Sequence, residues 1–97
     1  MNELTLFVKY TAKPGMRERF VRTLVEKGIV TAIRNEAGCI CYDYYFSAQD
    51  ENVVLLVEKW ESAEHQRVHM TQPHMAEVKT VKEQFVADTA FGDAALR

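Results

Sequence analysis

The first segment of the chain alternates between apolar and polar side chains. Residues 4–12 follow this period of two, which predicts a β-strand with one buried face. Phe7 adds apolar character to the second face of the same strand. The sequence Lys13-Pro14-Gly15 then ends the strand, because proline cannot donate to a ladder and glycine favours a turn.

The pattern changes over residues 16–36, where apolar side chains recur at steps of three and four. This spacing predicts one amphipathic helix, with Gly38 as its C-terminal stop. Gly28 falls in the middle of the predicted helix, where glycine costs about 1 kcal/mol relative to alanine. We therefore expect either a close approach of the helix to the sheet at Gly28 or space left for another group.

Two further strands are predicted by residues 39–46 and 53–61. The polar sequence SAQDEN joins them and is typical of a hairpin connection. The run from Val53 to Val57 is apolar on both faces of its strand. Both faces of the sheet are therefore expected to be covered at this strand.

The last third of the chain predicts two short helices and a final strand. Ser62 is a suitable N-cap for a helix that runs to about residue 70. Pro73 suits the first position of a second helix, which runs to about residue 83. Residues 85–91 then predict a fourth strand.

The order of elements is β-α-β-β-α-β, which predicts an α+β, ferredoxin-like domain with an antiparallel sheet. The chain shows no repeat, linker or low-complexity segment, so we expect a single domain over residues 1–97. The helices would cover one face of the sheet, and the other face would still carry apolar side chains. A homodimer that closes two sheets face to face into an α+β barrel would cover them.

Composition narrows the range of partners. The chain has 97 residues, 47% hydrophobic side chains and a formal net charge of -2. This hydrophobic content excludes wholesale disorder, and the charge gives no reason to expect nucleic acid or an anionic membrane as a partner. The opening MNELTLFVKY lacks a basic n-region, and no apolar run reaches spanning length. We therefore expect a cytoplasmic protein.

Cys39 and Cys41 are one residue apart, so in a strand they would point to the same face. A disulfide between them would be strained, and a single C-x-C pair provides only half of a typical zinc site. We expect two reduced, mostly buried thiols. The sequence also lacks G-x-G-x-x-G, a Walker loop and G-x-S-x-G, so no nucleotide or other cofactor is expected.

The stretch HMTQPHM at residues 69–75 holds two of the three histidines, and His65 lies one helical turn earlier. If Met70 points inward, Gln66 lies on the same side of the helix, and His65 and His69 adjoin it. Such a face is too polar for a simple core and predicts a small wet pocket beneath the helix.

Three uses of these histidines are compatible with the pattern: metal binding, proton transfer and structural hydrogen bonding. His65 and His69 have the i,i+4 spacing of the H-E-x-x-H motif, but the glutamate is not at its required position. His74 lies beyond a proline break, so we predict no metal site. Histidine has a pKa suited to proton transfer, which makes His69 a candidate base.

Trp60 and Glu58 are two residues apart, so they share one face of the third predicted strand. A tryptophan at a strand end is most often part of the core. Trp60 could also form the wall of a pocket for a flat ligand, together with Phe7 or Tyr44. Tyrosines bury well but need a hydrogen-bond partner, which either a ligand pocket or a subunit interface would supply.

Four motifs together resemble the antibiotic biosynthesis monooxygenase (ABM) domain family over nearly the whole chain: KPG at 13–15, EAGC at 36–39, EKWES at 58–62 and HMTQPHM at 69–75. Trp60 matches the family's tryptophan, and His69 and His74 match its H-x-x-x-P-H stretch. The resemblance implies a dimeric α+β barrel of ferredoxin-like subunits with a pocket between helices and sheet.

The family includes cofactor-independent quinol monooxygenases, haem-degrading enzymes and an isomerase that processes a phosphorylated signal. Its haem degraders carry an asparagine in strand one and a haem-ligating histidine in the last helix. Here Val8 stands at the first position and Lys79 near the second, which argues against haem degradation.

We therefore predict a cofactor-independent monooxygenase that oxidises a quinol or polycyclic phenol with O2. His69 would be the catalytic base and Trp60 the flat wall beside the substrate. The residues expected to bind substrate are His65, Gln66, Tyr44, Phe7, Glu58 and His74. The alternatives are an isomerase of a small oxygenated metabolite and a non-catalytic dimer that binds a small molecule.

Overall fold

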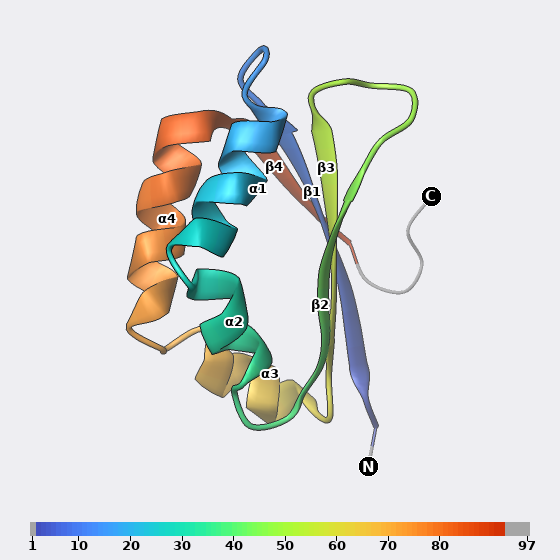
Figure 1. Cartoon of the computed structure of the whole chain (residues 1–97). Helices are drawn as coiled ribbons and strands as arrows, with labels where there is room; N and C mark the ends of the chain where they lie inside the picture. The colour runs from blue at the N-terminus through green and yellow to red at the C-terminus, as the bar shows by residue number, and fades with distance from the viewer. Residues whose placement is uncertain (1, 93–97) are drawn as a thin grey trace.

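The computed structural model describes residues 2–92 and shows one antiparallel sheet with all helices on one side of it (Figure 1). The strands are β1 (Leu4–Ala12), β2 (Cys39–Phe46), β3 (Val53–Trp60) and β4 (Val86–Gly92). They lie side by side in the order β2-β3-β1-β4. This arrangement confirms the predicted α+β, ferredoxin-like fold.

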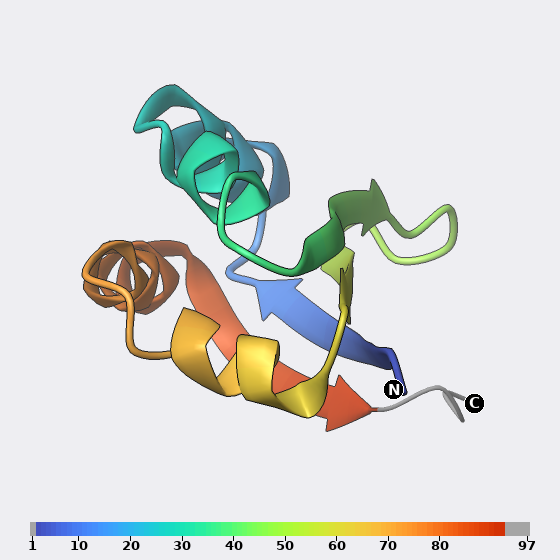
Figure 2. The ribbon, with the colours of Figure 1, turned by 90° about the horizontal axis from the view of Figure 1, so that it is seen from below.

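The helices are α1 (Arg17–Glu26), α2 (Ile29–Arg34), α3 (Ala63–His69) and α4 (His74–Phe85). Figure 2 shows α1 and α2 roughly in line above the sheet, with α4 beside them. In the same view α3 lies across one end of the sheet. Within residues 2–92, none of the helices combines the length and apolar character needed to cross a bilayer.

The prediction of one continuous helix over residues 16–36 is wrong, because Gly28 interrupts it. Gly28 has a φ of +75°, in the left-handed region that a right-handed helix cannot include. The Gly28 amide donates to the Val25 carbonyl at 3.0 Å and closes α1, and α2 begins at the next residue. A Cβ at position 28 would meet no atom of the described chain within 4 Å, so Gly28 is not explained by a close approach to the sheet.

The hydrophobic core lies between the sheet and the helices. Alternate residues of β1 and β3 point toward the helices, and α1, α2 and α4 cover them with apolar side chains. Large buried contributors include Tyr10, Phe20, Leu24, Ile29, Ile33, Tyr42, Leu56, Trp60 and Phe85. The rings of Tyr10 and Phe20 meet edge to face at 5.2 Å, which joins β1 to α1.

The opposite face of the sheet carries the other set of alternate residues. Phe7 and Val57 are directly paired on this face, and Lys9 is paired with Leu55. Within the described residues, no helix lies on this side of the sheet (Figure 1). This face therefore carries the apolar side chains that were predicted to need a second covering layer.

A β-bulge separates the two cysteines. The register of β2 against β3 shifts between Cys39 and Cys41, so Ile40 is an extra residue in the ladder. Cys39 packs against the core, whereas Cys41 is paired with Lys59 and contacts the Asp43 carboxylate at 3.2 Å. The prediction that both cysteines share a face is wrong, because the bulge reverses the alternation.

Candidate functional site

The stretch HMTQPHM forms the joint between α3 and α4. Ser62 caps α3 by accepting a hydrogen bond from the His65 amide at 3.2 Å, and His69 is the last residue of the helix. Pro73 is the N-cap of α4 and His74 is the first residue of the helix, so α4 begins one residue later than predicted. Met70 is 57% exposed, so it is not part of the buried core.

His69 is the buried residue of α3. Its side chain is 1% exposed, and its ring lies 4.6 Å from the Trp60 ring at a tilt of 33°. The Tyr42 ring approaches it edge-on at 5.8 Å. Aromatic groups from β2 and β3 therefore fix the orientation of the imidazole.

Glu36 holds the two histidines of the joint together. Its Oε1 and Oε2 lie 3.0 and 3.1 Å from His69 Nδ1, and its Oε2 lies 2.5 Å from His74 Nε2. Glu36 comes from the turn that follows α2, so three separate segments meet at this carboxylate. Glu36 is the first residue of the EAGC motif, and no role was predicted for it from the sequence.

Glu58 lies in the same layer, on the face of β3 that points toward the helices. Its side chain is buried, and its Oε1 accepts a hydrogen bond from Trp60 Nε1 at 2.9 Å. Burial raises the pKa of Glu58, and the charge of Glu36 adds to the increase. The hydrogen bond from Trp60 and the proximity of His69 oppose it. Glu58 therefore binds a proton at a higher pH than an exposed glutamate does.

Two tyrosines and a lysine complete the polar set. Burial raises the pKa of both Tyr10 and Tyr42 above that of an exposed tyrosine, so they are neutral hydroxyl donors at neutral pH. Burial lowers the pKa of Lys82, whose Nζ lies 5.3 Å from the centre of the Tyr10 ring. Lys82 is four residues after Val78 on the inner face of α4, a spacing that could have marked it in the sequence.

A cavity of about 140 Å³ lies between the sheet and the α3–α4 joint. Its lining combines apolar side chains, among them Leu6, Val8 and Val78, with polar ones, among them Tyr42, Glu58 and His69. Gln66 and Lys82 also reach it. Met70 and Phe91 line it too, although they are 57% and 79% exposed, so they lie at its opening.

The structure brings five of the predicted residues into one region. His69, Glu58 and Gln66 line the cavity, Trp60 contacts both Glu58 and His69, and His74 joins through Glu36. Glu36 and Lys82 were not predicted from the sequence.

Three other predicted residues lie elsewhere. Phe7 is on the opposite face of the sheet, paired with Val57. His65 Nδ1 lies 2.8 Å from Ser62 Oγ, in a local contact at the start of α3. Tyr44 packs edge-on against Phe20 with ring centres 6.4 Å apart, so it belongs to the core near α1.

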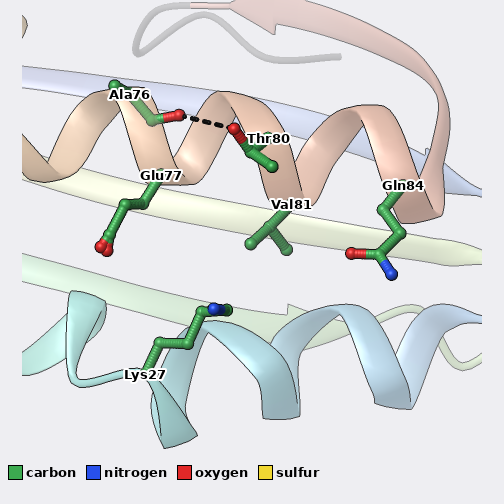
Figure 3. A pocket seen from close by; sticks show the side chains of 6 residues that line it. All are labelled: Lys27, Ala76, Glu77, Thr80, Val81 and Gln84. Atoms are coloured by element: carbon green, nitrogen blue, oxygen red, sulfur yellow. Dashed lines mark hydrogen bonds between the residues drawn. The ribbon is translucent and has the colours of Figure 1, made fainter.

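A second hollow of about 260 Å³ lies between the end of α1 and α4 (Figure 3). Lys27 faces α4 across it, and Glu77, Thr80 and Gln84 line the other side. Of its lining residues only Val81 is buried. The Thr80 hydroxyl donates a hydrogen bond to the Ala76 carbonyl at 3.2 Å. This hollow is larger than the cavity at His69, but its polar groups are mostly exposed.

Comparison with known proteins agrees with the fold and the motifs. The family model described as antibiotic biosynthesis monooxygenase (ABM) matches residues 4–81, and the chain belongs to this family. Membership supports a monooxygenase-like function at the level of the family, whose members are commonly dimeric. None of the curated proteins matches the sequence.

Solved structures share the fold over almost the whole chain. Protein PA3566 from Pseudomonas aeruginosa is 25% identical with a TM-score of 0.83, covering 100% of this chain and 96% of its own. Rv0793 from Mycobacterium tuberculosis is 23% identical with a TM-score of 0.80, covering 99% and 96%. SO0527 from Shewanella oneidensis is 21% identical with a TM-score of 0.83, covering 94% and 87%.

Proposed function

We propose that this protein is a cofactor-independent monooxygenase that oxidises a quinol or polycyclic phenol with O2 in the cavity beside His69. The observation that carries the proposal is the contact between Glu36 and His69 Nδ1, at 3.0 and 3.1 Å. A carboxylate only accepts, so it stabilises the tautomer of neutral His69 that has its proton on Nδ1. Nε2 then carries the lone pair, as in a catalytic base oriented by a carboxylate.

His69 Nε2 is the atom available to a substrate hydroxyl. Among residues 2–92, no side chain or backbone group forms a hydrogen bond with this atom. The atom is also absent from the set of completely buried polar atoms that lack a partner, so it keeps some access to the cavity. His69 itself lines the cavity. A phenolic hydroxyl placed there can therefore transfer its proton to Nε2.

Proton transfer to His69 is the step that starts the reaction. The resulting phenolate passes one electron to O2, and the two radicals combine into a peroxide, which loses water to leave a new carbonyl. For a quinol the balance is quinol plus O2 to hydroxyquinone plus water, so the substrate supplies all four electrons. No external reductant is required.

The other polar groups of the cavity fit this chemistry. Lys82 provides a positive charge that stabilises the phenolate and the superoxide formed next. Glu58 and Gln66 can hydrogen-bond to substrate oxygens. Trp60 acts by holding the His69 ring at 4.6 Å. The apolar lining keeps water from the charged intermediates.

The size of the cavity limits the substrate. A typical ligand pocket has a volume of about 300–1,000 Å³, whereas this cavity has about 140 Å³. A two-ring substrate therefore requires the exposed side chains of Met70 and Phe91 to turn outward. One ring beside His69 and a second ring in the opening would be accommodated in this way.

The proposal is tested with protein stripped of metal by a chelator. Menadiol and heavy-isotope O2 should give a hydroxyquinone that contains one labelled oxygen, at a rate above autoxidation in buffer. Mass spectrometry of the product and an oxygen electrode measure the two quantities. Oxygen consumption no faster than in buffer across a set of quinols would overturn the proposal.

The small volume also favours a second candidate, an isomerase of a small oxygenated metabolite that uses His69 as the same base. An isomerase needs no O2, because the atoms of its product are those of its substrate. Turnover of a small hydroxyketone under anaerobic conditions, followed by NMR, distinguishes it from the monooxygenase.

We propose further that the protein is a homodimer joined through the open face of the sheet. Phe7, Leu55 and Val57 lie on that face, where the described chain provides no covering helix. Family membership supports a dimer, because members of the family are commonly dimeric. Closing two sheets face to face would remove these apolar side chains from water.

A further inference from the structure

We propose that Glu36, His69 and His74 form a binding site for a divalent transition-metal ion. One carboxylate oxygen of Glu36, one ring nitrogen of His69 and one of His74 all lie within 4.8 Å of one another. No metal site was predicted from the sequence, because the glutamate of the H-E-x-x-H motif is not at its required position and His74 lies beyond a proline break. The structure instead combines His69 with a histidine beyond the proline and with a glutamate from the turn after α2.

The distances are close to those that a bound ion requires. Zinc binds imidazole nitrogen and carboxylate oxygen at about 2.0–2.2 Å, which places neighbouring ligand atoms about 3.3 Å apart in a tetrahedron. Here Glu36 Oε2 lies 3.1 Å from His69 Nδ1 and 2.5 Å from His74 Nε2. Small rotations of the side chains, without any change in the backbone, would open space for an ion between them.

The kinds of ligand select the kind of ion. Two imidazoles and one carboxylate suit zinc and the neighbouring first-row transition metals, whereas calcium and magnesium prefer oxygen ligands throughout. Three protein ligands leave at least one position for water or another small ligand.

The cluster is accessible from one side. The side chains of Glu36 and His74 are 10% and 21% exposed, whereas that of His69 is 1% exposed. An ion would therefore reach the cluster past His74 and meet His69 last. The Trp60 ring, 4.6 Å from the His69 ring, would hold that ligand in place.

Metal binding and the proposed base reaction exclude one another. An ion on His69 Nδ1 replaces the proton there, so the neutral ring carries its remaining proton on Nε2 and has no lone pair left to accept another. The metal would therefore switch off the metal-free reaction. This consequence rests on the proposed function, but binding of the ion does not.

A simpler explanation also accounts for the contacts. Glu36 could accept one N–H from His69 and one from His74, and the three side chains would then be satisfied without an ion. The two explanations differ in what happens when a metal is added, so a titration decides between them.

The test uses chelator-treated protein titrated with Co²⁺ and then with Zn²⁺. The expected result is one Co²⁺ per chain, with visible d–d absorption and without the near-ultraviolet band that a thiolate ligand gives. Zn²⁺ should displace Co²⁺ and raise Tm. Glu36→Gln and His74→Ala should weaken Co²⁺ binding by at least about tenfold, whereas His65→Ala, which removes a histidine outside the cluster, should not.

Three results would overturn the metal site: no saturable uptake of either ion, uptake unchanged in His74→Ala, or a thiolate band that Cys39→Ser or Cys41→Ser abolishes. His74→Ala is preferred to a change at His69, because His74 is the less buried side chain. Its Tm without metal shows that it has folded. Should Glu36→Gln or His74→Ala not fold, His74→Gln provides the same comparison.

The outcomes also separate this proposal from the proposed function. Protein that binds Co²⁺ at the cluster but does not oxidise quinols when metal-free would support the metal site and contradict the monooxygenase. Metal-free oxidation without any saturable Co²⁺ binding would give the reverse conclusion.

Discussion

Gly38 has a φ of +82°, and the ring of His65 occupies the space that a side chain at position 38 would need. The Gly38 carbonyl accepts a hydrogen bond from the Glu61 amide at 2.8 Å, which joins the turn before β2 to the end of β3. Gly38 is two residues after Glu36, so this local geometry helps to set the position of the carboxylate that the site depends on.

We expect Gly38→Ala to lower the free energy of unfolding by roughly 1–3 kcal/mol, because it adds both a left-handed strain and a clash with His65. Gly15→Ala is the matched control, since Gly15 has a φ of +77° and a Cβ there meets no described atom within 4 Å. Urea denaturation measures both. Adding His65→Gly to Gly38→Ala removes the ring and the Cβ that a side chain at position 38 would meet, so it should recover the part due to the clash. If it recovers none beyond the effect of His65→Gly alone, His65 is not the cause.

The buried carboxylate of Glu58 should make stability depend on pH. Its pKa is raised in the folded state, so folded protein binds the proton more tightly than unfolded protein does. The contribution of Glu58 to the free energy of unfolding is therefore most favourable below its pKa in the unfolded chain. This contribution is lost as the pH rises through its raised pKa in the folded protein.

Glu58→Gln should remove this loss of stability and retain an acceptor for the Trp60 N–H. We expect the variant to gain stability relative to the native chain as the pH rises from about 4 to about 8. Urea melts across that range check the expectation, with the exposed Glu77→Gln as control. Parallel pH profiles for the native chain and Glu58→Gln would contradict it.

At the scale of elements, one backbone conformation divides what the side-chain pattern shows as continuous. The apolar positions of α1 and α2 follow a single helical period, yet Gly28 ends one helix and begins the next. The side-chain pattern indicates which face of each helix is buried. It does not indicate the φ of a glycine between two segments that follow the same period.

Gly28→Ala distinguishes a helix break from a helix interior by the sign of its effect. Within a continuous helix, alanine would stabilise by about 1 kcal/mol. In the left-handed conformation observed here, we expect it to destabilise by about 1–2 kcal/mol. Gly28→Asn should cost less than Gly28→Ala, because asparagine tolerates this region. Thermal unfolding monitored by circular dichroism measures both variants.

The same limit explains how far the site could be predicted. His69 and His74 stood out because their residue types and the proline between them are visible in one short stretch. Glu36 was missed because it lies 33 residues before His69, and its role depends on a turn whose direction no local pattern gives. His65 was misplaced because a capping contact with Ser62 satisfies it locally.

At the scale of the whole molecule, the open sheet face should determine the assembly. Leu55→Glu places a charge at the centre of the proposed interface, and we expect it to convert the dimer into a monomer. Val25→Glu is the control, because Val25 is 54% exposed on α1. Sedimentation velocity gives the mass of each. A native chain that sediments as a monomer would contradict the dimer.

A change at His69 alone tests its proposed role as the base. We expect His69→Gln to reduce kcat for quinol oxidation by about 10²–10⁴-fold, with Glu77→Gln unchanged. Circular dichroism shows whether the variant has folded. A folded His69→Gln enzyme with the native kcat would remove His69 from the role of base.

The reach of Glu36 across the chain also bears on how the protein folds. Its contacts join residues 33 and 38 positions apart, which tie the turn after α2 to the α3–α4 joint. Closing such long loops is slow relative to forming a local helix or hairpin. The α3–α4 joint should therefore be among the last parts of the chain to form during refolding, and pulsed hydrogen exchange would show late protection of its amides relative to those of the central strands.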